Sequence, residues 1–286
     1  MSRIAYVNGR YLPHRQACVH IEDRGFQFAD GVYEVIAVRR GGFVDEAPHL
    51  KRLHRSLGEL RIAPPMSDAA LKAVMHETIR RNRVIDGILY LQITRGAAPR
   101  DFPFPPGARP SLIMTARAQR PLDPKLFERG VRVVTVPDIR WARPDIKSVA
   151  LLPNALGKQH AKEAGAYEAW QVDRDGNVTE GTSSNAWIVT PKNEIVTRQA
   201  DHAILNGVTR LGVVQVAHDA GLTLVERPFS VAEAKAAREA FLTSTTNFVV
   251  PIVQIDEAIV GEGRPGDFVR RLRALYTEFA LKGVVR

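Results

Sequence analysis

The stretch "WARPDIKSVALL", residues 141–152, places one lysine, Lys147, inside a run that otherwise reads as a strand leading into a buried segment. Burying an ammonium group without a partner is costly, so the pKa of such a lysine falls and its neutral amine becomes a nucleophile. The alternative is that Lys147 reaches the surface along its apolar stem, or pairs with Asp145. From this stretch alone, the ordinary surface lysine is the simpler interpretation.

Length and composition describe a soluble protein with a substantial core. The chain has 286 residues, enough for two moderate domains or one large α/β domain. The single cysteine, Cys18, excludes an intramolecular disulfide, and no secretory leader is visible, so we expect a cytoplasmic protein. Apolar runs such as "FVVPIVQI" (248–255) fall short of the roughly 20 residues that span a bilayer, so no membrane partner is expected.

The formal charge of +9 suggests a nucleic-acid partner, but the distribution of that charge does not. Basic residues are scattered, and the strongest cluster, "RRLRALY" (270–276), has the spacing of a solvated helix face. No basic stripe with interleaved aromatic residues is visible. The eight histidines show no metal-ligand spacing. We therefore expect neither a nucleic-acid partner nor a metal ion.

The first part of the chain alternates between β-like and helical patterns. Asn8-Gly9 and Gly41-Gly42 are hairpin signals, each between short β runs. Helical spacing follows at 49–60 and 68–84, and two further β runs at 87–96 and 110–118. The sequence predicts a smaller N-terminal α/β domain over residues 1–120, and a proline-bearing linker over 121–130.

The second part, residues 131–286, is also mixed α/β, is the larger domain, and carries Lys147. Its predicted strands lie at 131–136, 167–173, 185–190 and 194–198, and its predicted helices at 207–221, 231–241 and 266–283. The predicted fold class is therefore α/β, with mixed α+β content in two domains.

Three further segments carry polar groups that would suit a cofactor, because one supplies a carboxylate and two supply groups that bind phosphate. "NVTEGTSSNAWIV" (177–189) contains Glu180, "LNGVTRLGVV" (205–214) puts free N–H groups at a helix start, and "FLTSTTN" (241–247) is a hydroxyl-rich turn. Capping and turn formation explain each one separately. Together with Lys147 they match the needs of pyridoxal 5′-phosphate (PLP): a lysine for a Schiff base, an acid at the pyridine nitrogen and a phosphate anchor.

Six motifs in this order resemble the fold-type IV PLP-dependent aminotransferases (class IV), and are most similar to the D-amino-acid (D-alanine) aminotransferases. The motifs are "DRGFQFADGVYEV" (23–35), "HLKRL" (49–53), "DIKS" (145–148), "TEGTSSN" (179–185), "LNGVTR" (205–210) and "TSTTN" (243–247). The resemblance covers nearly the whole chain. It implies a fold-type IV enzyme with two α/β domains, the cofactor between them, and a homodimer.

The resemblance also implies roles for single residues. Lys147 would hold PLP as the Schiff-base lysine and would carry the proton during turnover. Glu180 would pair with the pyridinium nitrogen. Arg52 would clamp the 5′-phosphate with its planar fork. The rest of the phosphate cup would come from Val208, Thr209, Ser244 and Thr245.

Substrate recognition is where the sequence departs from the family pattern. Tyr33 and Arg100 match residues that hold the substrate carboxylate, Arg100 reaching into the site of the partner subunit. Phe102 stands where a histidine is common, and an apolar ring cannot donate to a carboxylate. Asp101 would compete for the Arg100 guanidinium.

The expected reaction is transamination between a D-amino acid resembling D-alanine and a 2-oxo acid such as 2-oxoglutarate. Three alternatives on the same fold stay open: a branched-chain L-amino-acid aminotransferase, an (R)-amine transaminase and an aminodeoxychorismate lyase. A cofactor-free binding protein is the alternative outside this enzyme class.

Overall fold

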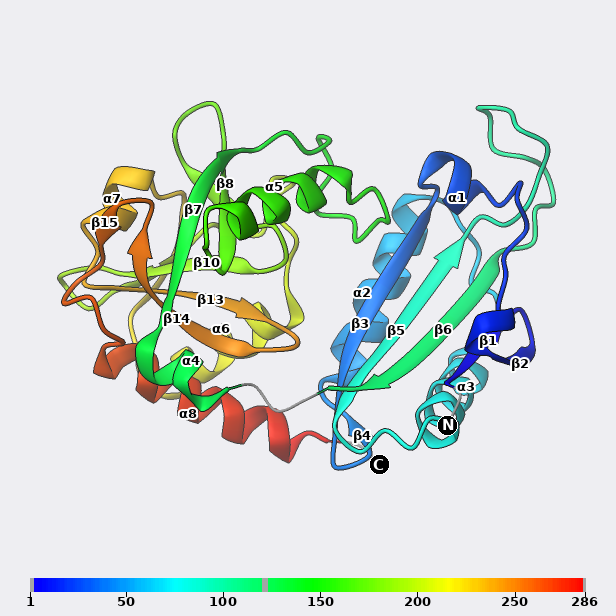
Figure 1. The fold of residues 1–286 in the computed structure, drawn as a ribbon, viewed down its shortest axis with the longest axis horizontal. Helices are drawn as coiled ribbons and strands as arrows, with labels where there is room; N and C mark the ends of the chain where they lie inside the picture. The colour runs from blue at the N-terminus through cyan, green and yellow to red at the C-terminus, as the bar shows by residue number, and fades with distance from the viewer. Residues whose placement is uncertain (1–2, 120–122, 285–286) are drawn as a thin grey trace. The chain divides into compact units, whose positions relative to one another are not determined.

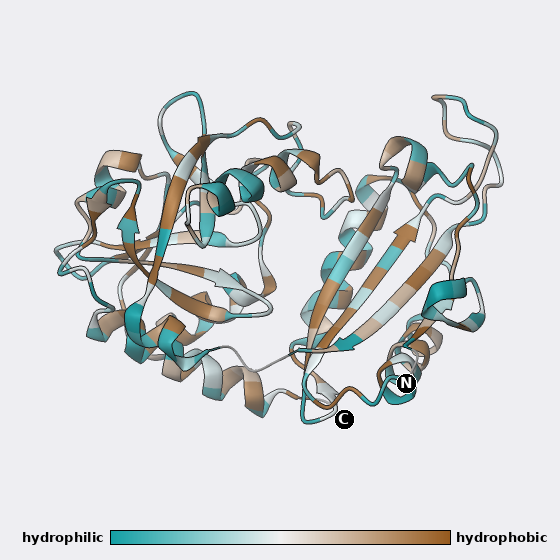
Figure 2. Ribbon diagram, viewed as in Figure 1, coloured by the Kyte–Doolittle hydropathy of each residue, from teal (hydrophilic) through white to brown (hydrophobic). Residues whose placement is uncertain are grey.

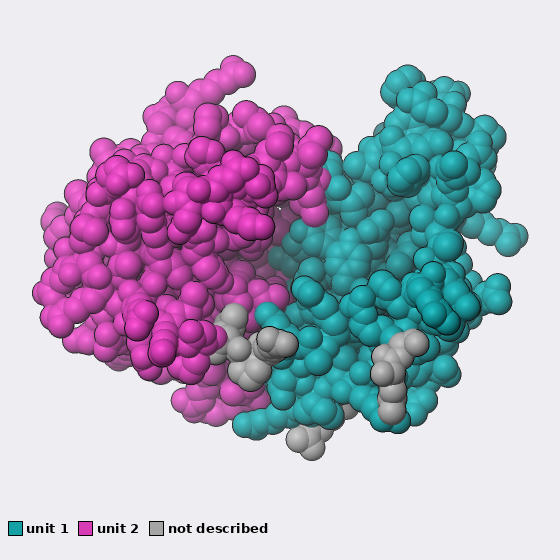
Figure 3. Space-filling view, viewed as in Figure 1, with its two compact units in different colours: residues 1–120, 146–150, 283–286 teal, residues 121–145, 151–282 magenta. Residues whose placement is uncertain are grey.

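The computed structural model describes residues 3–119 and 123–284, which form two compact units (Figures 1 and 3). Unit 1 contains residues 1–120, 146–150 and 283–286. Unit 2 contains residues 121–145 and 151–282. Each unit has its own sheet and its own core. The expected mixed α/β fold is confirmed.

Unit 1 is built on a six-stranded sheet in the order β2-β1-β6-β5-β3-β4 (Figure 1). All neighbouring strands are antiparallel. The strands are β1 (Ile4–Val7), β2 (Arg10–Pro13), β3 (Gly31–Arg39), β4 (Gly42–Phe43), β5 (Gly87–Thr94) and β6 (Ser111–Ala118). Both predicted hairpins are present, because Val7 pairs with Arg10 and Arg39 pairs with Gly42.

Two long helices bury the apolar residues of this sheet. The helices of unit 1 are α1 (Arg24–Phe28), α2 (Glu46–Glu59) and α3 (Asp68–Arg81), with a short 3-10 helix at His14–Gln16. Leu50, Leu53 and Leu57 follow one another at helical spacing on α2 and are buried in the unit 1 core. Figure 2 shows hydrophobic residues gathered along β3, β5 and β6. The core therefore lies between this sheet and its helices.

Residues 146–150 belong to unit 1, although the sequence placed Lys147 in the C-terminal domain. The backbone N–H of Tyr33 donates to the carbonyl of Lys147 at 3.0 Å, and that of Val149 donates to Gly31 at 3.0 Å. The physical reason is that β4 covers β3 only at Val38 and Arg39, so the start of β3 has an edge whose polar groups need partners.

Unit 2 contains a nine-stranded mixed sheet in the order β12-β11-β10-β13-β14-β7-β8-β9, with β15 paired to β14. Its strands are β7 (Val131–Pro137), β8 (Glu168–Val172), β9 (Val178–Gly181), β10 (Asn185–Val189), β11 (Ile195–Thr197), β12 (Leu224–Glu226), β13 (Glu239–Ser244), β14 (Phe248–Ile255) and β15 (Ala258–Ile259). β7 is parallel to both of its neighbours, β14 and β8. The candidate site residues of this unit lie on β9, just after β7, at the end of β13 and at the start of α6 (Val208–Asp219).

The helices of unit 2 differ from the expectation in three places: those at 124–129 and 152–163 were not predicted, and the helix expected over 231–241 ends early. They are α4 (Pro124–Arg129), α5 (Leu152–Glu163), α6 (Val208–Asp219), α7 (Val231–Lys235) and α8 (Asp267–Lys282). Within the expected linker 121–130, residues 121–122 lie outside the described residues and α4 follows, capped by Asp123, which accepts from the N–H of Lys125 at 3.0 Å.

The helix expected over 231–241 is wrong in its second half, where Glu239 begins β13. Pairing with β10 overrides the helical propensity of this alanine-rich segment. The Glu239 carboxylate also accepts from the N–H groups of Phe268 and Val269 at 3.1 and 2.8 Å, at the start of α8. None of the helices in the described part of the chain combines the length and hydropathy needed to cross a membrane.

Candidate active site

Lys147 is half-buried, and its ammonium group lies against an aromatic face. Its backbone is fixed on both sides, since its N–H donates to Ser56 Oγ at 3.3 Å and its carbonyl accepts from Tyr33. The Nζ atom lies 4.2 Å from the centre of the Tyr33 ring. Among the described residues no carboxylate forms an ion pair with this amine. A cation–π contact is a weak interaction that leaves the amine able to react.

Asp145 does not take the role of a partner for Lys147. Its carboxylate accepts from Arg143 Nε and Nη2 at 2.9 and 3.0 Å, and it lies 3.3 Å from His202 Nδ1. Pairing with Asp145, one of the alternatives for Lys147, is therefore contradicted. Lys147 and Arg143 each lie two residues from Asp145 in sequence, but it is the planar guanidinium of Arg143 that meets the carboxylate with two hydrogen bonds.

Tyr33 and Tyr90 line the surface of unit 1 on which the lysine lies. Their rings stack at 5.8 Å, and the Tyr90 hydroxyl donates to Gln92 Oε1 at 2.6 Å. Burial, together with the nearby Tyr33, raises the pKa of Tyr90 to about 12, so this hydroxyl stays protonated. The sequence pointed to Tyr33 alone. The pairing of β3 with β5 sets Tyr33 opposite Gln92 and Val35 opposite Tyr90. Tyr90 therefore lies diagonally across from Tyr33 on the same face of the sheet, and this pairing is the signal that could have identified it.

Arg52 is bound through two nitrogens to a buried carboxylate that the sequence did not reveal. Its Nε and Nη2 atoms donate to the two oxygens of Glu34, both at 2.8 Å, and His49 Nδ1 lies 2.7 Å from Glu34 Oε2. Burial would raise the pKa of Glu34, but the Arg52 guanidinium lowers it strongly, so the side chain is an anion although only 1 % of it is exposed. Burial lowers the pKa of His49, which is therefore neutral at pH 7.

The signal for this cluster is the spacing of "HLKRL". His49 and Arg52 stand three residues apart on α2 and so share the helix face that meets β3. A glutamate next to Tyr33 on β3 must then point to the opposite, helix-covered side of the sheet. Whether Arg52 also binds a phosphate stays a prediction.

Arg100 is exposed, and its guanidinium lies beside two aromatic rings that also contact each other. The Arg100 Cζ atom is 5.1 Å from the centre of Phe28 and 5.9 Å from that of Phe102. Asp101 does not compete for it, because Asp101 Oδ1 accepts from the backbone N–H of Phe102 at 2.8 Å, and no ion pair joins Arg100 to Asp101 in the described ranges. The predicted competition is wrong because the short aspartate side chain caps its own turn.

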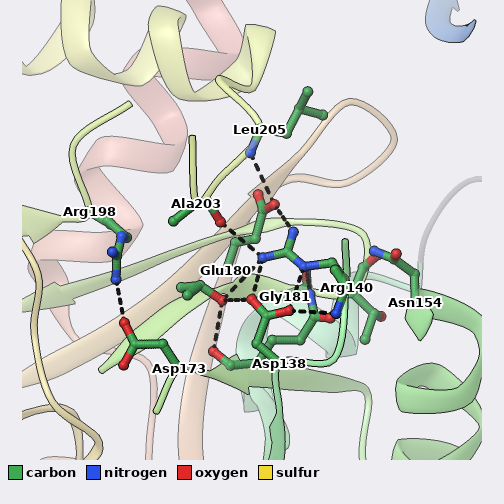
Figure 4. A network of polar contacts seen from close by, with 12 residues as sticks. Asp138, Arg140, Asn154, Asp173, Glu180, Gly181, Arg198, Ala203 and Leu205 are labelled. Carbon is green, nitrogen blue, oxygen red and sulfur yellow. Dashed lines mark hydrogen bonds and ion pairs between the residues drawn. The ribbon is translucent and has the colours of Figure 1, made fainter. Parts of the chain in front are cut away.

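In unit 2 the carboxylate of Glu180 is surrounded by donors (Figure 4). One oxygen, Oε1, accepts from the N–H of Leu205 at 3.0 Å and from Arg140 Nη1. The other, Oε2, accepts from Asn185 Nδ2 at 3.0 Å. Glu180 is buried on β9, so these donors replace the water that an ionised carboxylate needs.

Arg140 and Asp138 form the second layer of this network (Figure 4). Arg140 donates to Asp138 Oδ1 and Oδ2 at 2.9 and 2.6 Å and to the Ala203 carbonyl at 3.0 Å, with 4 % of its side chain exposed. Burial would lower the pKa of Arg140, but the bonds and charges of Asp138 and Glu180 raise it, so it stays cationic. The sequence missed both residues, although "PDIR" (137–140) stands at the end of strand β7.

The start of α6 is an uncapped helix N-terminus. Gly207 occupies the N-cap position without a side-chain hydrogen bond to the helix, and both Val208 and Thr209 are buried. A Cβ atom on Gly207 would lie 2.1 Å from Asn185 Oδ1, so this close approach requires glycine. N–H groups at such a terminus need an acceptor, and an anion suits them.

Ser244 provides an independent sign of a ligand in the same unit. Its Oγ atom is buried and has no hydrogen-bond partner among the described residues, whereas the neighbouring Thr243 Oγ1 accepts from Trp187 Nε1 at 2.9 Å. Ser244 ends β13 and Thr245 follows in the turn, and α6 packs on β13. An unpartnered hydroxyl and an uncapped helix start fit a phosphate group.

Comparison with known proteins decides the family. Residues 31–255 match the family model described as amino-transferase class IV. The chain belongs to the class IV aminotransferases. This class IV aminotransferase is 42 % identical to the D-alanine aminotransferase of Bacillus licheniformis over 267 residues, 93 % of each chain. It is 36 % identical to the D-alanine aminotransferase of Staphylococcus haemolyticus over 96 % of each chain.

Solved structures support the fold of this class IV aminotransferase. A branched-chain aminotransferase from Thermoproteus uzoniensis superposes with a TM-score of 0.85 at 26 % identity, covering 99 % of this chain and 96 % of that one. The 4-amino-4-deoxychorismate lyase of Pseudomonas aeruginosa gives 0.83 at 27 % identity, covering 96 % and 98 %. The expected family, its fold and its aminotransferase class are confirmed.

Proposed function

We propose that this class IV aminotransferase transfers an amino group between a D-amino acid such as D-alanine and a 2-oxo acid such as 2-oxoglutarate, with PLP as cofactor. The observation that carries the proposal is its 42 % identity to a D-alanine aminotransferase along 93 % of both chains. The branched-chain enzyme and the lyase superpose well, but at 26 and 27 % identity. Fold alone does not select among activities that share it.

Lys147 is the proposed Schiff-base lysine and proton carrier. PLP, when bound, supplies an electron sink that makes the Cα–H bond of an attached amino acid acidic. The contacts of Lys147 suit proton transfer, because its backbone is fixed by Tyr33 and Ser56 while Nζ contacts only a ring face among the described residues. It would take the proton from Cα of the substrate and later return one to the cofactor.

Glu180 is the proposed partner of the pyridine nitrogen. A carboxylate in that place holds a proton on the ring nitrogen by its negative charge. The donors from Leu205, Asn185 and Arg140 keep Glu180 anionic and fix its direction. The residue is therefore set for electrostatic stabilisation rather than for proton transfer.

The phosphate anchor is proposed to use the backbone N–H groups of Val208 and Thr209 with Ser244 and Thr245. The unpartnered Ser244 Oγ and the uncapped start of α6 support this role. Arg52 would add a cation whose direction is set by its bonds to Glu34.

Tyr33 and Arg100 are proposed to bind the substrate carboxylate, with Arg100 acting in the site of the partner subunit of a homodimer. The exposure of Arg100 leaves its donors able to meet a carboxylate. Sedimentation analysis of the holoenzyme tests the homodimer. A cytoplasmic location goes with this proposal, because small amino and 2-oxo acids are the partners.

The decisive experiment incubates the holoenzyme with D-alanine and 2-oxoglutarate and measures pyruvate and D-glutamate. We expect both products in equal amounts, and none with K147A. Turnover of L-leucine without turnover of D-alanine would favour the branched-chain alternative instead. Including (R)-1-phenylethylamine in the donor panel shows whether a carboxylate is required at all.

A further inference from the structure

The segment that carries Arg100 is held by a buried cluster on unit 1 that the proposed chemistry does not use. At its centre, the Asp30 carboxylate accepts from Arg24 Nε at 2.7 Å and from Arg95 Nε and Nη2 at 2.7 and 2.9 Å. The side chains of Arg24, Arg95 and Asp30 are 3, 7 and 9 % exposed. Two arginines that share one carboxylate in the protein interior form a rigid, fork-shaped arrangement.

Arg24 uses its remaining donors on the backbone immediately after Arg100. Its Nη1 atom donates to the Asp101 carbonyl at 2.6 Å, and its Nη2 atom donates to the Phe102 carbonyl at 3.3 Å. Its guanidinium also lies 4.7 Å from the centre of Phe28, the ring that Arg100 contacts from 5.1 Å. One buried cation therefore fixes both the backbone and the aromatic surface beside Arg100.

Arg95 holds the same segment further along the chain. Its Nη2 and Nη1 atoms donate to the carbonyls of Leu60 and Arg61 at 2.7 and 3.0 Å, which fasten it to the end of α2. Its Cζ atom lies 3.6 Å from the centre of the Phe104 ring, a close stacking contact. The segment from Arg100 to Phe104 is thus attached at both ends to one Asp30-centred cluster.

We propose that Arg24 is a positioning residue for substrate selection: held by Asp30, its guanidinium fastens the backbone after Arg100 and so fixes the direction in which Arg100 meets a substrate carboxylate. This proposal rests on the proposed function, in which Arg100 binds that group. A loosened segment would spread Arg100 over many directions, and the free energy of ordering it would be subtracted from carboxylate binding. Chemistry at Cα would be unaffected once the substrate is bound.

The first test measures the segment itself in the holoenzyme by limited proteolysis with trypsin. Arg100 is the one lysine or arginine among residues 96–108, and Arg109 precedes a proline, so cleavage in this segment reports on Arg100. We expect R24Q to be cut after Arg100 about tenfold faster than the wild type, since its hydrogen bonds to two carbonyls and a carboxylate are lost. R109Q, at an exposed arginine beyond this segment, should be cut after Arg100 at the wild-type rate. Equal rates in R24Q and wild type would overturn the proposal.

The second test measures carboxylate selection. In R24Q the KM for D-alanine and the Kd for propionate, a carboxylate without an amine, should each rise about tenfold, while kcat stays within about threefold. R24K keeps the charge toward Asp30 but loses the planar fork of the guanidinium, so its KM and Kd should lie between those of the wild type and R24Q. A kcat that falls with KM and the propionate Kd unchanged would contradict the proposal.

Two further variants keep the outcome interpretable. If R24Q does not fold, D30N retains one oxygen acceptor for the arginines and should give the same changes at smaller size; no change in D30N would count against the cluster. R100Q separates this inference from the proposed function. If R100Q leaves the propionate Kd unchanged, Arg100 does not bind the carboxylate and the selection role of Arg24 falls, whereas trypsin still reports whether Arg24 fastens the segment.

Discussion

Each unit contains a buried glutamate–arginine pair. The proposed roles of the glutamate and the arginine in one unit are the reverse of their roles in the other. In unit 1, Glu34 supports Arg52, and the arginine is the proposed cofactor ligand. In unit 2, Arg140 supports Glu180, and the glutamate is the proposed ligand. A buried charge is costly on its own, so a functional ion of either sign needs a counter-ion behind it. A glutamate–arginine pair can therefore offer either a cation or an anion to a ligand, depending on which of the two residues is the counter-ion behind it.

Removing the charge of Glu180, the proposed anionic ligand of unit 2, should have the largest effect on catalysis. E180Q replaces the carboxylate with a neutral amide of the same shape, and we expect kcat to fall about 100- to 1000-fold, as when one preorganised electrostatic contact to the reacting system is lost. Steady-state kinetics at saturating PLP measure this. E257Q, at a carboxylate that is 91 % exposed, is the matched control and should keep wild-type kcat. Wild-type kcat in E180Q would remove Glu180 from the proposed mechanism.

Removing the enclosed cation should act mainly on stability. R140M leaves the half-buried Asp138 and the buried Glu180 without the cation that they share, and we expect the free energy of unfolding to fall by about 3–5 kcal/mol. Urea unfolding of the holoenzyme followed by circular dichroism measures it. R264M, at an exposed arginine paired with Glu262, should unfold like the wild type. A loss as small as that of R264M would show that Arg140 does not act as a counter-ion.

Replacing Arg52, the proposed cationic ligand of unit 1, should weaken the affinity for the cofactor. R52K keeps the charge but loses the fork, so we expect the Kd for PLP to rise about 10-fold while kcat at saturating PLP changes little. Fluorescence titration of the apoenzyme with PLP gives the Kd. R55K, at an exposed arginine three residues further along the same helix, is the control. If R52K lowers kcat and leaves the PLP Kd unchanged, Arg52 is not a phosphate ligand and the two pairs are not exchanged versions of each other.

The smallest expected effect is a pH dependence in unit 1. Burial holds the pKa of His49 below its ordinary value of 6.5. Below pH 6.5 the unfolded chain therefore takes up a proton that the folded chain does not, and stability falls as the pH falls, by at most about 1.4 kcal/mol per pH unit from this group. Thermal unfolding between pH 7 and pH 5 should show a steeper loss for the wild type than for H49Q. H218Q, at an exposed histidine, should follow the wild type; equal slopes in H49Q would contradict the prediction.

The sequence pointed to the proposed ligand-binding residues more readily than to the residues that support them. Lys147, Glu180 and the turn at Ser244 stand in short motifs whose chemistry can be read locally. Glu34 and Arg140 could not be read this way, because each becomes a counter-ion only through a partner 18 or 40 residues distant in the chain. Elements followed the same rule. The hairpin at Asn8-Gly9 was predicted from local turn chemistry, while the end of α7 is set by sheet pairing from elsewhere.

The membership of Lys147 in unit 1 was also beyond local reasoning. The chain enters unit 2 before residue 146 and returns to it after residue 150. Periodicity along the sequence assigns a segment to the domain of its neighbours, whereas hydrogen bonds to Gly31 and Tyr33 assign this one to the other sheet. A five-residue excursion has too few residues to show a hydrophobic period.

This excursion has a consequence for biosynthesis. Residues 1–120 leave the ribosome first, yet the strand edge at Gly31–Tyr33 stays unpaired until residues 147–149 have been translated. An N-terminal fragment made alone would carry an open edge beside apolar β-strands, the arrangement that favours intermolecular pairing. The segment that carries Lys147 thus also closes the N-terminal sheet, and truncations that remove it should yield aggregates rather than an inactive domain.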